Sequence, residues 1–250
     1  MKITTILLAA GKGMRMKSKL PKVLHPLVGR PMVWHALQAI QDFTDEAPVL
    51  VVGYQGDEVI AAVGDAAQFV EQTEQLGTGH AVMQTTETLR GKTTLVLVTY
   101  GDMPLLTSET FHQIVETQKT NAGPITMLSM INENPRGFGR VVRDSSRLVK
   151  AIIEEVDCTP EQLEIKELNV GVYCFEANWL WETLSKIPLS EKGEYYLTDM
   201  VGLANNAGLP VKSVVLADAR EGMGINSRVH LAEANKIMQQ RINQHWMLAG

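Results

Sequence analysis

The sequence has few of the residues that build disulfide frameworks, histidine metal sites or nucleic-acid surfaces. It holds only two cysteines among 250 residues, and their spacing fits neither a CxxC motif nor a disulfide framework. The six histidines are scattered without paired spacing, so we interpret them as ordinary core or surface residues. The formal net charge of −5 disfavours a general nucleic-acid surface, so we expect no nucleic-acid partner.

Long apolar runs are also missing. No segment stays apolar for long enough to span a membrane, and the sequence has no repeat or low-complexity tract. The start, "MKITTILLAAG", imitates a signal peptide, but its apolar run is short, rich in β-branched residues and continues into a charged glycine turn. A buried first strand explains these features better than a leader does, so we expect a cytoplasmic protein without a membrane partner.

What the first half does contain is an alternation of apolar strands and helical patterns. Segments rich in apolar residues and without polar alternation, typical of strands covered on both faces, lie at 3–10, 47–54 and 93–102. Helical patterns follow them or lie between them, at 31–43, 56–65, 79–89 and 107–118. This order predicts an α/β fold with a doubly wound, mostly parallel sheet, similar to a Rossmann fold.

The pattern changes in the second half. Segments 137–144 and 147–155 indicate antiparallel strands around a serine turn, and 167–177 indicates a further strand. We interpret this part as a β-rich lobe inserted over the sheet. A helix at 197–208 and a strand at 209–217 follow. The last segment, 227–250, predicts a long helix capped by Ser227, with one apolar face formed by Leu231, Ala234, Met238 and Ile242.

A basic, glycine-containing loop follows the first apolar segment. Five basic residues and no acidic ones lie in "LLAAGKGMRMKSKLPKV", residues 7–23. The Gly11-Lys12-Gly13 turn can bring backbone N–H groups close to phosphate oxygens, while Arg15 and Lys22 can contact them as a fork and a point charge. The loop matches neither the dinucleotide fingerprint nor a Walker A motif. Composition alone favours a polyphosphate site and a solvated basic loop equally.

An aspartate follows the strand predicted at 93–102. Asp102 stands in "TYGDMP", where Pro104 stops the strand from continuing. A single carboxylate beside a phosphate site suits Mg²⁺, although an aspartate that caps a turn is the alternative. Asn226, in "GINSR", is a candidate second oxygen ligand that local sequence alone does not single out.

A series of short motifs is similar to those of the sugar-phosphate nucleotidyltransferases. They are "LAAGKGMRM", "PKVLH", "EQLGTGHA", "YGDMPL", "GFGR", "LNVGVY", "GEYYLTD" and "GINSR", in the family's order along the whole chain. The likeness is greatest to the branch that transfers a uridylyl group to N-acetylglucosamine 1-phosphate. The resemblance implies a nucleotidyltransferase domain over 1–226 that makes UDP-N-acetylglucosamine and pyrophosphate from UTP, with Mg²⁺ as cofactor.

The resemblance also implies roles for individual residues. Those carried over to the nucleotide are Leu8, Ala9, Ala10, Gly11, Gln72, Gly77, Thr78, Tyr100 and Gly101, of which Gln72, Gly77 and Thr78 would read the uracil. Gly139, Glu154 and Asn169 would hold the N-acetylated sugar. Asp102 and Asn226 would ligate Mg²⁺, and Arg15 and Lys22 would be the catalytic cations. Glucose 1-phosphate or dTTP as the substrate, and a nucleotide-binding regulatory protein without turnover, remain alternatives.

Three departures from the family pattern stand out. Met14 replaces a threonine in the basic loop, for which we expect weakened rather than abolished activity. Val156 stands where the family commonly has a lysine, which leaves the surroundings of the sugar phosphate open. The sequence ends at Gly250, before the hexapeptide repeats of the left-handed β-helix found in the bifunctional members, so we expect no acetyltransferase activity. The oligomeric state stays open.

Overall fold

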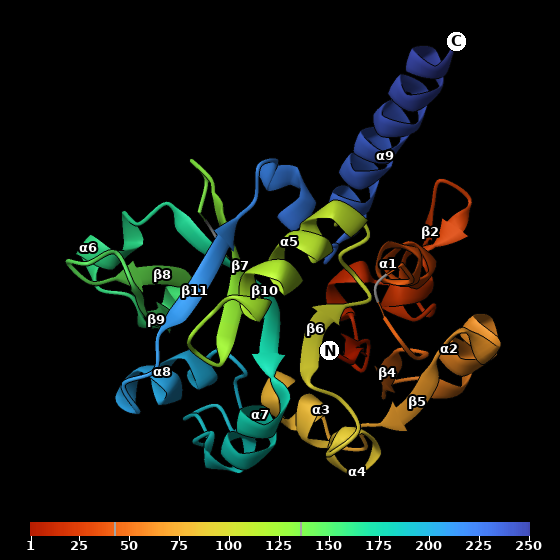
Figure 1. Cartoon of the computed structure of the whole chain (residues 1–250). Helices are drawn as coiled ribbons and strands as arrows, with labels where there is room; N and C mark the ends of the chain where they lie inside the picture. The colour runs from red at the N-terminus through yellow and green to blue at the C-terminus, as the bar shows by residue number, and fades with distance from the viewer. Residues whose placement is uncertain (43, 136) are drawn as a thin grey trace.

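A mostly parallel sheet forms the centre of the protein in the computed structural model, which describes residues 1–42, 44–135 and 137–250 (Figure 1). Its main path runs β11-β7-β10-β6-β1-β4-β5, and every neighbouring pair is parallel except those of β10. The strands are β1 (Ile3–Leu8), β4 (Val49–Val52), β5 (Gln68–Glu71), β6 (Leu95–Tyr100), β7 (Ile125–Ile131), β10 (Glu167–Glu176) and β11 (Val211–Val215). The predicted doubly wound α/β fold is confirmed.

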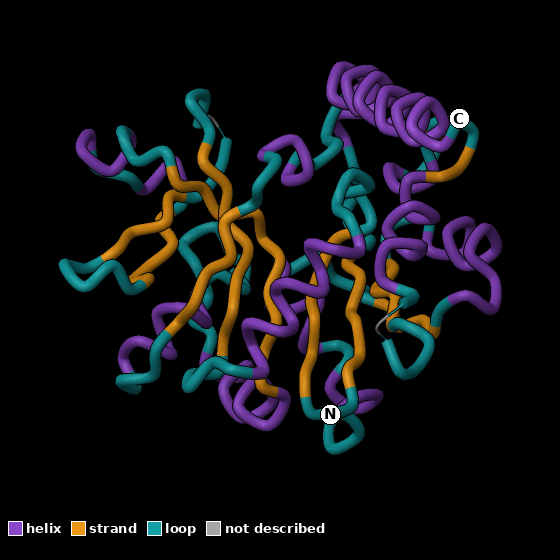
Figure 2. Tube along the Cα trace, turned by 45° about the horizontal axis from the view of Figure 1, so that its top comes forward, coloured by secondary structure: helices purple, strands orange, loops and turns teal. Residues whose placement is uncertain are grey.

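Helices cover both faces of this sheet (Figure 2). They are α1 (Met32–Ile40), α2 (Gly56–Val63), α3 (Thr78–Met83), α4 (Thr86–Leu89), α5 (Ser108–Lys119), α7 (Ala177–Thr183), α8 (Asp199–Asn206) and α9 (Arg228–Ala249), with the short α6 (Pro160–Leu163) in the lobe. Alternate side chains of β1 enter two different apolar clusters: Leu7 packs with α1 and α5, and Ile6 with α3, α7 and α8. A strand buried on both faces has no polar, solvent-facing side, which explains why its apolar residues do not alternate with exposed polar ones; even Thr4 and Thr5 are buried.

The capping residues of α5 and α9 are of the types that favour helix starts, whereas some helix boundaries differ from the predicted ones. The hydroxyls of Thr107 and Ser227 accept hydrogen bonds from backbone N–H groups in the first turns of α5 and α9, and Ser227 is the predicted cap. The helix predicted over 79–89 is instead two short helices, because the chain turns at Thr85, whose hydroxyl donates to the Val82 carbonyl at 2.7 Å. The predicted end of the first helix, Phe43, lies outside the described residues.

The predicted β-hairpin of the lobe is confirmed, but the next strand has a different place. β8 (Arg140–Arg143) and β9 (Val149–Ile153) pair antiparallel. β10, which the sequence analysis grouped with this lobe, lies in the middle of the central sheet between β6 and β7, and it meets β8 only where Leu168 pairs with Arg140. The lobe is therefore an extension of the same sheet. A small hairpin of β2 (Pro26–Leu27) and β3 (Arg30–Pro31) was not predicted.

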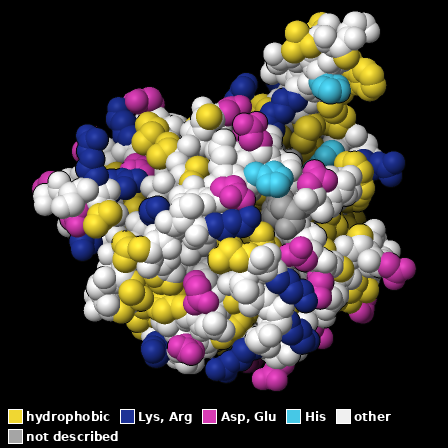
Figure 3. All heavy atoms as spheres, in the orientation of Figure 1, with side chains coloured by type: hydrophobic (Ala, Val, Ile, Leu, Met, Phe, Trp, Pro, Cys, Tyr) yellow, Lys and Arg dark blue, Asp and Glu magenta, His cyan; other side chains and the backbone are white. Residues whose placement is uncertain are grey.

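Helix α9 buries apolar residues against the body in its first half, and Arg241 in its second half donates to the Leu105 carbonyl at 2.6 Å. Ala234 and Ile237 are buried in a cluster with Leu27 and Leu105. The predicted face is only partly used, because Ile242 lies beyond the cluster and is 37% exposed. The last turns project from the body with apolar side chains on their surface (Figures 1 and 3). Of the described helices, none is both long and apolar enough to cross a bilayer.

Candidate functional site

Two adjoining cavities open at the carboxyl ends of the central strands. The first, of about 320 Å³, lies where β1 and β6 end side by side, with Leu8 paired to Tyr100. Its lining contains Leu8, Ala9, Ala10, Gly11, Lys22, Gln72, Gln75, Gly77, Thr78, Tyr100, Asp102, Glu194 and Tyr196. Parallel strands expose their carboxyl ends at one edge, which is where ligands bind in open α/β sheets. Most of the residues predicted to contact the nucleotide are therefore brought together here; Gly101 is buried beside them.

Lys22, Asp102 and Asn226 form a polar cluster at this cavity. The Lys22 ammonium donates to the Asp102 carboxylate and, at 3.1 Å, to Oδ1 of Asn226, although Asn226 lies 204 residues away in the chain. The Asn226 loop is fixed beside Asp102 because the Ile225 N–H donates to the Asp102 carbonyl at 2.9 Å. The convergence of these residues, which local sequence could not establish, is present in the structure.

The donor set of this cluster fits a hard divalent cation. The Asp102 carboxylate and the Asn226 amide oxygen already converge on one positive group, the Lys22 ammonium. Carboxylate and amide oxygens, one or two per site, are the protein ligands that Mg²⁺ uses beside phosphates. Within the described residues, no group of three or more His, Cys, Asp or Glu side chains could hold a metal ion. These two oxygens are therefore the candidate ligands.

The basic loop runs along Lys22. Gly13 has a φ of +60°, and a Cβ there would lie 2.7 Å from Cβ of Lys22, so both the backbone conformation and the close packing favour glycine. Gly11 and Lys22 line the first cavity, but Arg15 is exposed and lines neither cavity. Met14 is also exposed. The structure thus separates the two predicted catalytic cations: only Lys22 lies at the cavity.

A buried glutamine lies at the other end of the first cavity. Gln72 is 3% exposed, and its side-chain amide donates to the Gly77 carbonyl at 3.0 Å. Gly77 has a φ of +97°, and a Cβ there would lie 2.6 Å from the Tyr195 carbonyl oxygen. Thr78 begins α3 directly after it. The three residues predicted to read a base are therefore contiguous in space.

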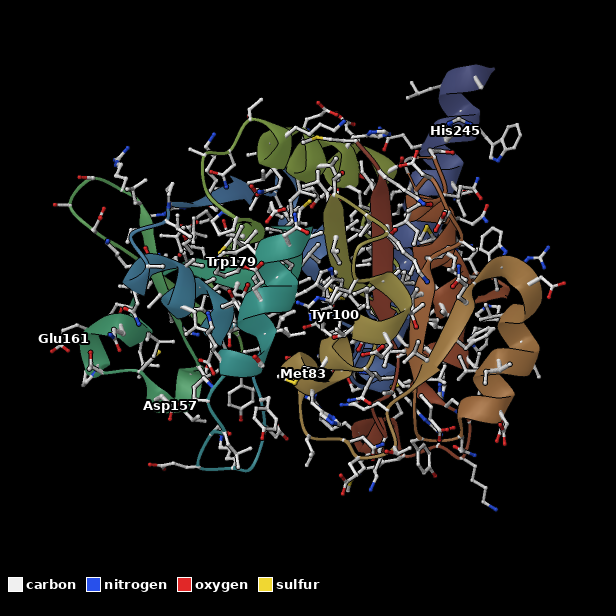
Figure 4. All side chains as sticks on the ribbon, turned by 60° about the horizontal axis from the view of Figure 1, so that its bottom comes forward. Met83, Tyr100, Asp157, Glu161, Trp179 and His245 are labelled. Atoms are coloured by element: carbon white, nitrogen blue, oxygen red, sulfur yellow. The ribbon has the colours of Figure 1, made fainter. Side chains whose placement is uncertain are left out.

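Tyr100 forms the wall between the two cavities and lines both. It lies near the middle of the molecule, with Met83 of α3 below it and Asp157 of the lobe farther to the left in the view of Figure 4. Gly171, at a φ of +90°, lets the β10 backbone pass so close that a Cβ would lie 3.1 Å from the Tyr100 ring. Burial raises the pKa of the Tyr100 phenol, and Asp102 and Glu154 raise it further. The phenol therefore stays neutral.

The second cavity, of about 350 Å³, reaches from Tyr100 into the lobe. Its lining contains Thr78, Tyr100, Gly137, Glu154, Glu155, Val156, Asn169, Lys192, Tyr196 and Thr198. Asn169 uses its Oδ1 to accept from the Gly171 N–H and the Tyr173 hydroxyl at 3.1 and 3.0 Å, which directs its amide N–H groups elsewhere. Gly139 lies next to Glu154, since a Cβ on Gly139 would lie 3.6 Å from a side-chain oxygen of Glu154. The predicted sugar residues are thus neighbours.

The charge balance of the second cavity centres on Glu154. Burial raises the pKa of its carboxyl; the nearby Asp157 raises it further, Lys192 opposes this, and Asp199 again raises it. A half-buried carboxyl accepts hydrogen bonds from hydroxyl or amide donors, which suits a sugar.

Sequence reasoning missed the loop that crosses both cavities. Its residues Glu194 and Tyr196 line the first cavity and Lys192 the second, although "GEYYLTD" was recognised as a motif without assigned roles. Backbone hydrogen bonds fix the loop to the start of α3, from Tyr195 N–H to the Leu76 carbonyl and from Gly79 N–H to the Tyr195 carbonyl, both 2.8 Å. Over a hundred residues separate these partners, so no local pattern connects them.

Comparison with known proteins now identifies the family. A protein-family model described as "MobA-like NTP transferase domain" matches residues 5–156. The chain belongs to the MobA-like NTP transferase family. Among solved structures of similar fold is the CMP:2-keto-3-deoxy-manno-octonic acid synthetase complexed with CTP, with a TM-score of 0.71 and 17% identity; the match covers 96% of this chain and all of that one.

Curated relatives of this NTP transferase include longer proteins. The "Bifunctional protein GlmU" of Heliobacterium modesticaldum is 44% identical over 250 residues, which are all of this chain and 55% of that protein. The protein of the same name from Enterococcus faecalis is 43% identical over 246 residues, 98% of this chain and 54% of that protein. The chain spans about half the length of the curated relatives it matches. The motifs singled out in the sequence therefore belong to a nucleotidyltransferase domain.

Proposed function

We propose that the chain transfers UMP from UTP to N-acetylglucosamine 1-phosphate, giving UDP-N-acetylglucosamine and pyrophosphate in an Mg²⁺-dependent reaction. The observation that carries this proposal is the pair of cavities joined at Tyr100, with the Lys22–Asp102–Asn226 cluster at the first one. One cavity is available for each substrate. Relatives named "Bifunctional protein GlmU" support the same assignment.

The chemistry needs positioning and positive charge more than an activated side chain. A phosphate oxygen of the sugar 1-phosphate attacks the α-phosphorus of UTP, the bond to the β-phosphate oxygen breaks, and pyrophosphate leaves with the electron pair. The nucleophile is already ionised, so the obstacle is repulsion between two anions and the charge that grows on the leaving group. Lys22 contributes an ammonium at the first cavity to oppose both.

Asp102 and Asn226 would hold the Mg²⁺. A bound magnesium ion supplies positive charge to the phosphate oxygens of the nucleotide. Asp102 would also orient the Lys22 ammonium, which it contacts directly. The Asp102 carboxylate would therefore contact two cations, Mg²⁺ and the Lys22 ammonium, at the place where the two phosphate groups react.

The two ends of the paired cavities would bind the non-reacting parts of the substrates. Gln72, Gly77 and Thr78 would contact the base in the first cavity. Glu154 and Asn169, with Gly139 leaving room behind them, would contact the hydroxyl and N-acetyl groups in the second. Binding energy from these remote groups is used to align the reacting phosphates.

A second candidate is the same transfer to another sugar 1-phosphate, such as glucose 1-phosphate, or from dTTP. The observation in its favour is Val156, which lines the second cavity with 71% of its surface exposed, at the position where the motif resemblance implies a lysine. An apolar side chain there changes how the sugar phosphate is held.

One assay distinguishes these functions. The protein is mixed with Mg²⁺, UTP and N-acetylglucosamine 1-phosphate, and pyrophosphate and nucleotide sugar are measured, followed by the same assay with glucose 1-phosphate and with dTTP. We expect release with UTP and the N-acetylated sugar, abolished by chelation of Mg²⁺ and by Asp102→Asn. Product formed only from glucose 1-phosphate or dTTP supports the second candidate. UTP binding without product in any combination supports a regulatory protein.

A further inference from the structure

Two segments far apart in the chain carry the candidate metal ligands, and hydrogen bonds join these segments. Asp102 follows β6, and Asn226 lies in the segment between β11 and α9. The Ile225 N–H donates to the Asp102 carbonyl at 2.9 Å, and Arg241 of α9 donates to the Leu105 carbonyl at 2.6 Å. The separation of the two ligand oxygens therefore depends on contacts between the segments that carry them.

A carboxylate anchors the second segment to the end of the first. Oε2 of Glu221 lies 3.1 Å from both the backbone nitrogen and the hydroxyl of Thr107, and 2.7 Å from the hydroxyl of Thr110. The N–H and hydroxyl groups can donate, whereas a carboxylate oxygen only accepts. These donors lie at the start of α5, directly after the segment that carries Asp102, and Figure 1 shows the blue turn that precedes α9 beside α5.

The chain between this anchor and Asn226 has a point of low restraint. The turn Ala219–Gly222 is closed by its own backbone hydrogen bonds, among them one from the Glu221 N–H to the Asp218 carbonyl at 3.0 Å. Gly224 follows this turn, and of the described residues only the Asn226 amide comes within 4 Å of a Cβ placed there. Glycine has the widest backbone freedom of all residues. The loop therefore has to be fixed from outside, and Glu221 does this on the side of the turn.

We infer that Glu221 is a positioning residue for the Lys22–Asp102–Asn226 cluster. Its carboxylate holds the loop against the start of α5, so that the Asn226 amide oxygen stays beside the Asp102 carboxylate. Glu221 lines neither cavity, so it acts on a bound metal through Asn226 and not by contact. The metal part of this inference rests on the proposed function, because it needs a metal-bound nucleotide in the first cavity.

The test measures by calorimetry how much Mn²⁺, as a probe for Mg²⁺, tightens the binding of UTP. In Glu221→Ala we expect this gain in UTP affinity to fall by about tenfold, the lower end of the loss that follows removal of a group orienting a metal ligand. UTP affinity without metal should stay unchanged. Glu221→Gln, whose amide oxygen can still accept from the threonines, should keep most of the gain. An unchanged gain in Glu221→Ala, or an equal loss of affinity with and without metal, would overturn the positioning role.

Glu176 provides a matched control for Glu221. Its carboxylate accepts hydrogen bonds from the Asn178 and Trp179 N–H groups at the start of α7, at 3.1 and 2.7 Å. It lines neither cavity and pairs with Leu95 at the opposite end of β6 from Tyr100. Glu176→Ala removes a comparable anchor at a helix start and should leave the Mn²⁺ gain intact. A similar loss of the gain in this variant would show that general loosening of the fold is the cause, which would refute the inference.

A double-variant cycle tests whether Glu221 acts through Asn226. In an Asn226→Ala background the Mn²⁺ gain is reduced to what Asp102 and the phosphates supply, and Glu221→Ala should lower it no further. Additive losses would mean that Glu221 affects the metal by another route, against the inference.

The anchor can also be measured without nucleotide or metal. The Ile225 N–H, which donates to the Asp102 carbonyl, should exchange with solvent faster in Glu221→Ala than in the wild type, and at the wild-type rate in Glu176→Ala. Thr110→Val removes one donor to Glu221 and keeps the side-chain shape, so it should act in the same direction even if Glu221→Ala fails to fold. An unchanged exchange rate in these variants would refute the inference. Absence of UTP binding would instead refute the proposed function and leave this measurement valid.

Discussion

The first and second cavities share Tyr100 but are built differently. The first lies at the ends of buried parallel strands, and its polar groups are held by partners within the described chain, as Gln72 is by Gly77 and Lys22 is by Asp102. The second is lined by the lobe and by a long loop, with the exposed Val156 and Lys192 in its wall. The contrast indicates that the fold preorganises the first cavity, which we propose binds the nucleotide. Residues of the second cavity, which we propose binds the sugar, can be substituted with little cost to stability.

The largest loss of activity is expected when the cationic side chain of the first cavity is removed. Lys22→Ala should lower kcat by about thirtyfold to a thousandfold, a barrier increase of about 2–4 kcal/mol, because it removes charge that opposes phosphate repulsion. Steady-state rates of pyrophosphate release and a thermal melt would measure this.

Arg15→Ala is the matched variant for Lys22→Ala. Sequence alone gave Arg15 and Lys22 equal weight, but Arg15 is exposed outside the lining, so we expect a smaller loss of kcat. Equal losses in the two variants would show that the loop closes over the nucleotide and that the cavity is less preorganised than described.

Glu154→Gln should affect only the sugar end. We expect kcat/KM for the N-acetylated sugar 1-phosphate to fall by about tenfold or more, because a carboxylate acceptor is lost, with nucleotide binding unchanged. Product assays and UTP calorimetry on the same preparation would measure both. A weakened UTP affinity would contradict the separation of the two cavities.

The same variant should raise stability at neutral pH. Burial raises the folded-state pKa of Glu154, so its contribution to stability is complete below the ordinary glutamate pKa and is lost as pH rises through the raised value. Glu154→Gln should therefore increase Tm at pH 7 by about 1–3 °C and leave it nearly unchanged at pH 4. A decrease at pH 7 in a scanning calorimeter would show that the carboxylate is stabilised in the fold.

Lys192 offers a more moderate test of the second cavity. It is the one cationic side chain in the lining of that cavity among the described residues, and its charge acts on Glu154. Lys192→Gln should raise KM for the sugar phosphate about threefold to tenfold, as expected for a partly exposed ion pair. Adding Val156→Lys to this variant should restore KM if either position can supply the charge. An unchanged KM in Lys192→Gln would mean that Lys22 alone meets the sugar phosphate.

The smallest effect is expected from the contact that links α9 to the basic loop. Arg228 donates to the carbonyls of Met16 and Lys17, both at 3.0 Å, and Lys17 has a φ of +49°. Arg228→Met should raise KM for UTP about twofold to threefold and lower stability by about 1 kcal/mol, because two hydrogen bonds to the loop are lost. Urea unfolding and UTP kinetics would measure this, with Arg220→Met, an exposed arginine paired with Asp218, as the control.

How much of this site the sequence predicted depends on the distance between the residues involved. The glycine turn, the aspartate after β6 and the caps of α5 and α9 follow from neighbouring residues, and the structure confirms the strand and helix ends that place them. The motif resemblance also selected Gln72, Glu154 and Asn169, which the structure brings to the two cavities. The loop with Glu194 and Tyr196 was not assigned, because its role depends on contacts with α3 far earlier in the chain.

The sequence by itself determined the alternation of buried strands and helices and the charged turn after β1, since each is set by local backbone preference and burial. The resemblance of its motifs to a known family supplied the candidate ligands. Only the tertiary structure decided that β10 enters the central sheet, that Asn226 reaches the Lys22 ammonium and that Arg15 stays outside the lining of the cavities. These outcomes depend on the packing of segments distant in the chain, and no short stretch of residues encodes that packing.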